Sequence, residues 1–211
     1  QQQASYVKFT GTNSYSGTTA LQNSVGLDLA GGAALLDTGR VTFTQSGSLG
    51  QALKLSSSES IGSIESSGMG MVFLLPDVTL TLGGNNASTA FTGLIVPIYA
   101  NYFSNFAGNT GLVKTGSGTF DLNLVSNTFY GTTNINAGTL ALTGRMGGIA
   151  FTVANGATLT TANNARIDAP ITIQSGGTLS PGASGGSSTG IFKAYGGLTV
   201  ASGGNLVITA N

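Results

Sequence analysis

Hydrophobic and polar residues alternate in short runs along most of this chain. Clear examples are Val78–Leu82 (VTLTL), Phe151–Val153 (FTV) and Leu198–Val200 (LTV). A period of two is typical of a β-strand with one buried face and one solvated face. No window of a dozen residues has helical periodicity, and each glycine would cost a helix on the order of 1 kcal/mol. The pattern therefore predicts an all-β fold.

Four windows repeat an apolar residue, small or polar residues, one or two glycines and then a new strand. They are Ile135–Leu140, Val153–Leu159, Ile173–Leu179 and Val200–Leu206, and their final leucines are spaced by 19, 20 and 27 residues. A period near 20 is what one coil of a β-solenoid needs, because each coil must return to the same position to pair with the next. The step of 27 indicates one coil with an inserted loop. Gly31-Gly32 and Gly176-Gly177 lack the aspartates of a glycine-rich calcium loop and are expected at tight corners with positive φ.

A longer repeat overlies the first one. Asn13–Thr19 and Asn127–Thr133 share the pattern Asn, any residue, aromatic, any residue, Gly, Thr, Thr. This second period is further evidence that the chain is built from recurring units.

Two segments depart from the repeat and are expected to be inserted loops. Residues 95–109 contain four aromatic side chains and Pro97, and residues 181–190 are rich in Gly and Ser. Exposed aromatic side chains that project together often mark a contact site, so Tyr99, Tyr102, Phe103 and Phe106 are a candidate contact patch. The alternative is that this loop folds back and covers one side of the solenoid.

The composition narrows the range of functions. The chain has 34 glycines, seven Lys plus Arg, seven Asp plus Glu and a net charge of zero, and 40% of its residues are hydrophobic. This apolar content argues against intrinsic disorder. A net charge of zero gives no basic surface that would attract nucleic acid or an anionic membrane. Without cysteine there are no disulfides or thiolate metal sites. No apolar run approaches the roughly 18 residues of a membrane span.

The sequence contains few of the residue types and spacings that catalysis requires. There is no histidine, so the commonest general base and metal ligand is missing. The carboxylates are spread along the chain, at Asp28, Asp37, Glu59, Glu65, Asp77, Asp121 and Asp168. A glycosidase or lyase site needs carboxylates that converge, and no pair has matching positions one coil apart. We expect no catalytic residues, no metal and no cofactor, and we expect Lys114 to be a solvated strand terminus.

One string of residues resembles a known bacterial family. It runs from Thr79–Asn86 through Phe91–Gly93, resumes at Gly111–Thr119 (GLVKTGSGT) and ends with Asn136–Leu140. This string is similar to the passenger-associated transport repeat of bacterial autotransporters. The resemblance implies a right-handed parallel β-helix exported by type V secretion, located outside the cell or on the outer-membrane surface, and often serving adhesion or display.

Together these observations predict one domain over residues 1–211, a right-handed parallel β-helix of about ten coils and roughly 50 Å in length. The expected function is a non-enzymatic structural or adhesive stalk or scaffold. Its expected partners are other copies of itself or adjoining β-helix coils, and a host or matrix surface. One alternative is a subunit that stacks end to end into an extracellular filament, and another is a polysaccharide-active enzyme.

Overall fold

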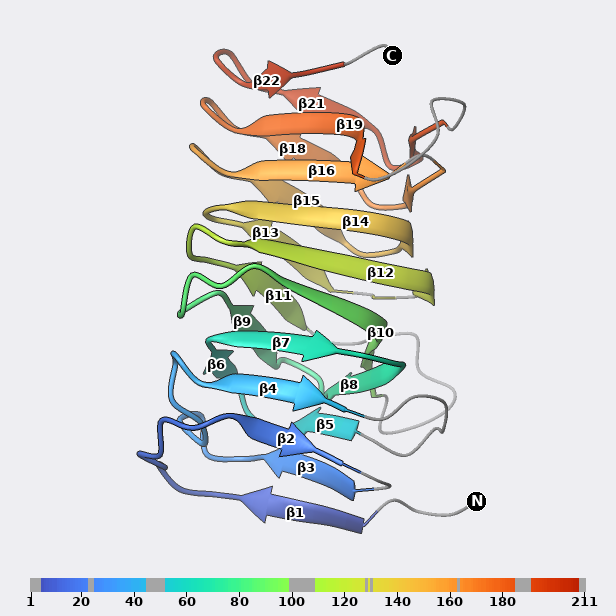
Figure 1. Cartoon of the computed structure of the whole chain (residues 1–211). Helices are drawn as coiled ribbons and strands as arrows, with labels where there is room; N and C mark the ends of the chain where they lie inside the picture. The colour runs from blue at the N-terminus through green and yellow to red at the C-terminus, as the bar shows by residue number, and fades with distance from the viewer. Residues whose placement is uncertain are drawn as a thin grey trace.

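The computed structural model describes residues 5–22, 25–44, 52–98, 109–127, 129, 131–162, 164–184 and 191–208. In these residues all regular structure is β-strand, and every strand pairing is parallel. The coils are stacked in sequence order, with the first and the last described strands at opposite ends of the stack (Figure 1). A parallel β-solenoid is thereby confirmed.

The largest sheet, sheet I, has twelve strands. Ten of them follow one path from the first coil to the last, and two lie beside that path. The path consists of β1 (Ser5–Phe9), β3 (Val25–Leu29), β5 (Ala52–Leu55), β8 (Gly70–Leu74), β10 (Thr89–Pro97), β12 (Thr119–Asn127), β14 (Thr139–Met146), β16 (Thr158–Ala162), β19 (Thr178–Ser184) and β22 (Asn205–Leu206), and the two others are β17 (Arg166–Ile167) and β20 (Lys193–Ala194).

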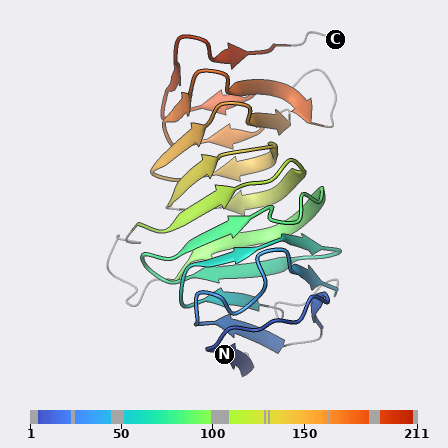
Figure 2. The ribbon, with the colours of Figure 1, turned by 90° about the vertical axis from the view of Figure 1, so that its left-hand side faces the viewer.

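Two smaller sheets complete the solenoid. Sheet II has seven strands: β6 (Glu59–Ile61), β9 (Thr79–Leu82), β11 (Gly111–Lys114), β13 (Thr132–Ile135), β15 (Ala150–Val153), β18 (Ile171–Ile173) and β21 (Leu198–Val200). Sheet III has three strands: β2 (Thr19–Leu21), β4 (Arg40–Phe43) and β7 (Ser63–Ser66). Figure 2 shows the stack from the side, with successive coils piled along one axis.

Long bent strands turn sheet I around a corner. In β10, Thr89–Thr92 pair with β12, whereas Gly93–Pro97 pair with β8. In β14, the segment up to Leu142 pairs with β16, and Arg145 and Met146 pair with β17. Gly144, between these two parts of β14, has a φ of 95°, a conformation that favours glycine. The cross-section is therefore three-sided, because one sheet supplies two of its sides.

The winding is right-handed. In Figure 1, β4, β7 and β16 run from left to right across the front, and the chain returns behind them while it climbs. The solenoid has about seven turns, fewer than the ten coils that the repeat predicted. The difference arises at the N-terminal end, where residues 10–18 and 30–39 contain no strand and sheet II begins only at β6.

The leucines that defined the repeat lie in one column. Leu140 pairs with Leu159, Leu159 with Leu179, and Leu179 with Leu206. The first three are fully buried. Because each side chain covers the one below it, stacking removes apolar area from water, which stabilises the rod by about 25 cal/mol per Å². The step of 27 residues includes the segment 181–190 that the sequence predicts to be a loop, but residues 181–184 belong to β19 and 185–190 lie outside the described residues.

One glycine of each pair predicted at a corner has a positive φ, Gly32 at 72° and Gly176 at 76°. The corresponding glycines of the other windows, Gly138, Gly156 and Gly203, have φ values of 63°, 74° and 79°. The longer repeat does not mark equivalent places, however: Thr19 lies in β2 of sheet III and Thr133 in β13 of sheet II. Similar local sequence therefore forms strands on different sides of the solenoid.

Candidate functional site

The predicted aromatic contact patch lies in residues 99–108, outside the described residues. Its four members are Tyr99, Tyr102, Phe103 and Phe106. Within the segment 95–109 that was expected to be a loop, Ile95–Pro97 are instead the last residues of β10 and pair with β8. A strand that turns the corner of sheet I thus occupies the start of the expected insertion.

Three of the carboxylates are paired with cations, at separate places in the fold. Asp28 contacts Lys54, Glu65 pairs with Arg40, and Asp168 pairs with two arginines. Among the described residues, no group of three or more Asp, Glu, His or Cys side chains could hold a metal ion. The same part of the chain contains no helix long and apolar enough to cross a membrane.

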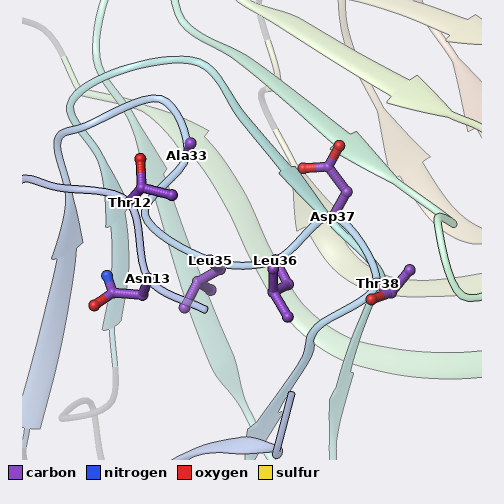
Figure 3. Close-up of a pocket in the computed structure, with 7 residues that line it drawn as sticks. All are labelled: Thr12, Asn13, Ala33, Leu35, Leu36, Asp37 and Thr38. Atoms are coloured by element: carbon purple, nitrogen blue, oxygen red, sulfur yellow. The ribbon is translucent and has the colours of Figure 1, made fainter. Parts of the chain in front are cut away.

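A shallow groove lies where the N-terminal coils lack strands of sheet II (Figure 3). It has a volume of about 410 Å³ and is lined by Thr12, Asn13, Ala33, Leu35, Leu36, Asp37 and Thr38. The amide nitrogen of Asn13 donates to the carbonyl oxygen of Ala34 at 2.8 Å, which ties one wall of the groove to the other. The groove contains a single carboxylate, that of Asp37, and so brings no pair of acids together.

Glu59 closes the edge of sheet II beside this groove. It is the first residue of β6, it is 3% exposed, and its two carboxylate oxygens accept hydrogen bonds from the backbone N–H groups of Ala34 at 3.1 Å and Leu35 at 2.9 Å. A buried carboxylate that accepts two backbone N–H groups replaces the missing strand pairing. Glu59 is therefore a structural acid rather than a candidate catalytic one.

A second charged cluster lies on the first coils of sheet I. Lys54 donates to Asp28 at 3.1 Å, Ser56 donates to the other oxygen of Asp28 at 2.6 Å, and the Lys54 ammonium lies 5.9 Å from the ring centre of Tyr6. Burial and the negative charge of Asp28 raise the pKa of Tyr6. Lys54 and Ser56 thus satisfy the Asp28 carboxylate. Because Tyr6, Asp28 and Lys54 come from β1, β3 and β5, the cluster joins three neighbouring strands.

Lys114 differs from the prediction. It is 2% exposed instead of solvated, and its Nζ donates to the carbonyl oxygens of Thr115 at 2.5 Å, Gly116 at 3.0 Å and Ala137 at 3.3 Å. Burial lowers the pKa of this ammonium group. The alternation of β11 turns Lys114 inward, and its long side chain reaches the turn carbonyls that the corner leaves unpaired. Lys114, in the string that resembles the passenger repeat, is therefore a corner brace.

A ladder of cations runs along three successive coils of sheet I. Arg145 in β14 pairs in register with Arg166 in β17, and Arg166 pairs with Lys193 in β20. Asp168 accepts hydrogen bonds from both arginines, from Arg145 at 2.7 Å. Burial alone would raise the pKa of Asp168, but the hydrogen bonds and positive charges of Arg166 and Arg145 outweigh it and lower that pKa. The Arg166 guanidinium lies 4.2 Å from the ring centre of Tyr195.

Sequence reasoning did not identify this ladder, although a signal was present. Arg166 and Lys193 each lie five residues before the first strand residue of sheet II in the next coil, Ile171 and Leu198, and Arg145 lies six residues before Phe151. Counting backwards from the sheet II strands would have aligned the three cations. Counting forwards from the leucine column does not align them, because they lie 5, 7 and 14 residues after Leu140, Leu159 and Leu179.

The last described coil has an open apolar edge. Leu198, Val200 and Leu206 are 39%, 39% and 45% exposed, whereas their register partners Ile171, Ile173 and Leu179 are buried. The contrast arises because no further strand covers this coil among the described residues. Among the described residues, the apolar column is therefore exposed at this coil.

Comparison with known proteins supports the family expected from the sequence. A family model described as passenger-associated-transport-repeat matches residues 6–23 and 112–142. No curated protein and no solved structure matches the chain. The second match covers β11 to the first half of β14, including the Lys114 brace and the Gly116 corner. The chain is a parallel β-solenoid that carries the passenger-associated transport repeat, a repeat found in autotransporter passenger domains.

Proposed function

We propose that this chain is a non-enzymatic structural module, a rigid stalk or scaffold exposed outside a bacterial cell. The observation that carries the proposal is the buried column of Leu140, Leu159 and Leu179, in which each coil depends on its neighbours for burial. Such a solenoid has a continuous interior from end to end and resists bending. The passenger repeat adds the location, because it implies secretion to the cell surface or the extracellular space.

The state of the acidic side chains favours a structural role over catalysis. Glu59 is saturated by backbone N–H groups, and Asp28 and Asp168 are paired with cations. A polysaccharide-active enzyme would need two free carboxylates facing one substrate groove. Incubation of the full chain with pectin-like substrates tests this point: we expect no turnover, and measurable cleavage would favour the enzyme.

A second candidate, end-to-end stacking into a filament, is favoured by the open edge at Leu198, Val200 and Leu206. Exposed strand edges with apolar side chains pair with further strands. The occupant that fits this edge is another β-helix coil, supplied by an adjoining part of the same polypeptide or by a second copy. In both cases the apolar column continues, which is the expected behaviour of a stalk segment.

Protease treatment of intact cells that produce the protein tests the location. We expect cleavage of the chain while a cytoplasmic control protein stays intact. Full protection of the chain on intact cells, with cleavage after lysis, would overturn the extracellular proposal.

Negative-stain imaging with size-exclusion chromatography tests the filament. Stacking predicts particles longer than one chain, and Leu206→Lys at the open edge would shorten them. Ile149→Lys is the matched control, because Ile149 is also exposed but lies before β15, away from the last coil. Strictly monomeric short particles would remove the filament and leave the stalk.

A further inference from the structure

The cation ladder concentrates charge in a chain that has almost none. Three of the seven Lys and Arg residues, Arg145, Arg166 and Lys193, stand on three successive coils. Neighbouring rungs of a β-sheet are about 4.8 Å apart, so the three positive charges form a line along the axis of the solenoid. The net charge of the whole chain is zero, so this line is a local excess.

The excess is not cancelled by neighbouring acids. Asp168 is shared by Arg145 and Arg166, and in the described part of the chain no ion pair involves Lys193. The three cations with one carboxylate leave two positive charges uncompensated. Elsewhere Arg40 pairs with Glu65, Lys54 pairs with Asp28, Lys114 is buried, and Lys8 is a single exposed lysine at the far end of sheet I. Within the described part of the surface, the ladder is therefore where an anion has the most favourable electrostatic interaction.

The ladder is also pre-organised. Arg166 is held between the Asp168 carboxylate and the ring of Tyr195, which fixes its guanidinium plane. A cation held in place before binding loses less conformational entropy when a ligand arrives. Tyr195 itself is 60% exposed, so the strip combines positive charge with an exposed aromatic surface.

We propose that Arg145, Arg166, Lys193 and Tyr195 form a binding strip for an acidic polysaccharide lying along the solenoid. An extended polyanion suits a line of charges on an open surface better than a compact ligand, which needs a concave pocket. The apolar face of a sugar ring packs against an exposed tyrosine, whose body is apolar and whose hydroxyl is polar. The shared chemistry is a repeated carboxylate or sulfate group.

Two other polyanions fit less well. Nucleic acid carries one negative charge per about 1.7 Å of duplex and is bound through many phosphate contacts, more than three cations supply. Anionic membranes are recognised by clusters of about four to eight Lys or Arg residues. The exposed Tyr195 also offers a surface for a sugar ring, which a site that binds by charge alone would not need.

Binding of the full chain to immobilised polysaccharides tests the proposal. Polygalacturonate supplies carboxylates, dextran sulfate supplies sulfates, and neutral dextran is the reference. We expect binding to at least one of the two anionic polymers, weakened by rising salt, and at least tenfold weaker binding for Lys193→Glu and for Arg145→Gln. Tyr195→Ala should weaken binding without altering the charge.

Lys8→Glu is the matched control, because Lys8 is an exposed lysine at the other end of sheet I. It should bind like the parent, and circular dichroism melting should show that all variants are folded. The proposal is overturned if neither anionic polymer binds better than dextran, or if Lys8→Glu weakens binding as much as Lys193→Glu. It is equally overturned if the ladder variants lose binding only to phosphatidylglycerol vesicles or to duplex DNA. The stalk proposal would survive each of these results.

Discussion

The Nζ atom of Lys114 donates a hydrogen bond of 3.3 Å to the carbonyl oxygen of Ala137, which lies in the corner of the next coil. The same ammonium group donates to two carbonyl oxygens of its own corner, at Thr115 and Gly116. One side chain thus satisfies acceptors of two successive coils at a place where the strands have ended. The passenger repeat match includes this lysine, which gives the motif a physical role in the stack.

Replacing Lys114 should therefore destabilise the solenoid. Lys114→Met keeps the length of the side chain but leaves three corner carbonyls without their donor. We expect a loss of about 1 to 3 kcal/mol in the free energy of unfolding, measured by urea denaturation. Lys193→Met removes an exposed lysine of the same chain and should cost less than about 0.5 kcal/mol. Equal losses for both variants would contradict the brace.

Alanine substitutions at three glycines distinguish the cost of backbone strain from the cost of a steric clash. Gly116 has a φ of 67°, and a Cβ there would lie 2.0 Å from the carbonyl oxygen of Gly83. Gly156 has a φ of 74° with nothing within 4 Å of a Cβ, and Gly17 has open space without a positive φ. Gly17→Ala should be neutral, Gly156→Ala should cost about 1 kcal/mol, and Gly116→Ala should cost clearly more. Thermal melting of the three variants checks this order, and a reversed order would show that the corners are wrongly placed.

Glu59 should be sensitive to the loss of a single oxygen. Glu59→Gln places an NH₂ group against one of the N–H groups of Ala34 or Leu35, so a buried donor loses its acceptor. We expect a cost of about 1 to 3 kcal/mol in urea denaturation. Glu65→Gln breaks a pair whose Arg40 side chain is 48% exposed, and should cost less than about 1 kcal/mol. A Glu65 variant that is the less stable of the two would be inconsistent with a structural role for Glu59.

Asp121 gives the stability a defined pH dependence. Burial raises the pKa of this carboxyl in the folded chain, and one of its oxygens is buried without a hydrogen-bond partner. The folded state therefore holds the Asp121 proton more tightly than the unfolded state, so stability falls as pH rises from the ordinary carboxyl pKa through the raised one. Asp121→Asn should be more stable than the parent at pH 7, by less than about 1 kcal/mol because the residue is only partly buried. This advantage should vanish at pH values below both pKa values, and an equal advantage at every pH would show that burial of the charged carboxylate is not its cause.

The strands and the stacking could be predicted from sequence because both depend on local patterns. Alternation marks the buried face, and the leucine spacing gives the coil length directly, as the pairing of Leu140, Leu159 and Leu179 confirms. The inward turn of Lys114 was missed because a charged residue at an apolar position is ordinarily solvent-exposed. The carbonyl oxygen of Ala137, one of its hydrogen-bond acceptors, comes close to Lys114 only when the next coil stacks on the coil that contains Lys114. The cation ladder depends on coil register across insertions, which a count from one repeat position does not give.

The central claim, that successive coils lie in register along one axis, is tested most directly by distances along sheet II. Ser60, Thr81, Val113, Asn134, Thr152, Thr172 and Thr199 form one outward column through seven strands. The chain has no cysteine, so pairs of introduced cysteines can carry spin labels without background. Pulsed electron paramagnetic resonance between position 60 and positions 152, 172 and 199 should give mean separations of about 19, 24 and 29 Å, one rung of roughly 4.8 Å per coil. Separations that fail to increase in this order would contradict the solenoid.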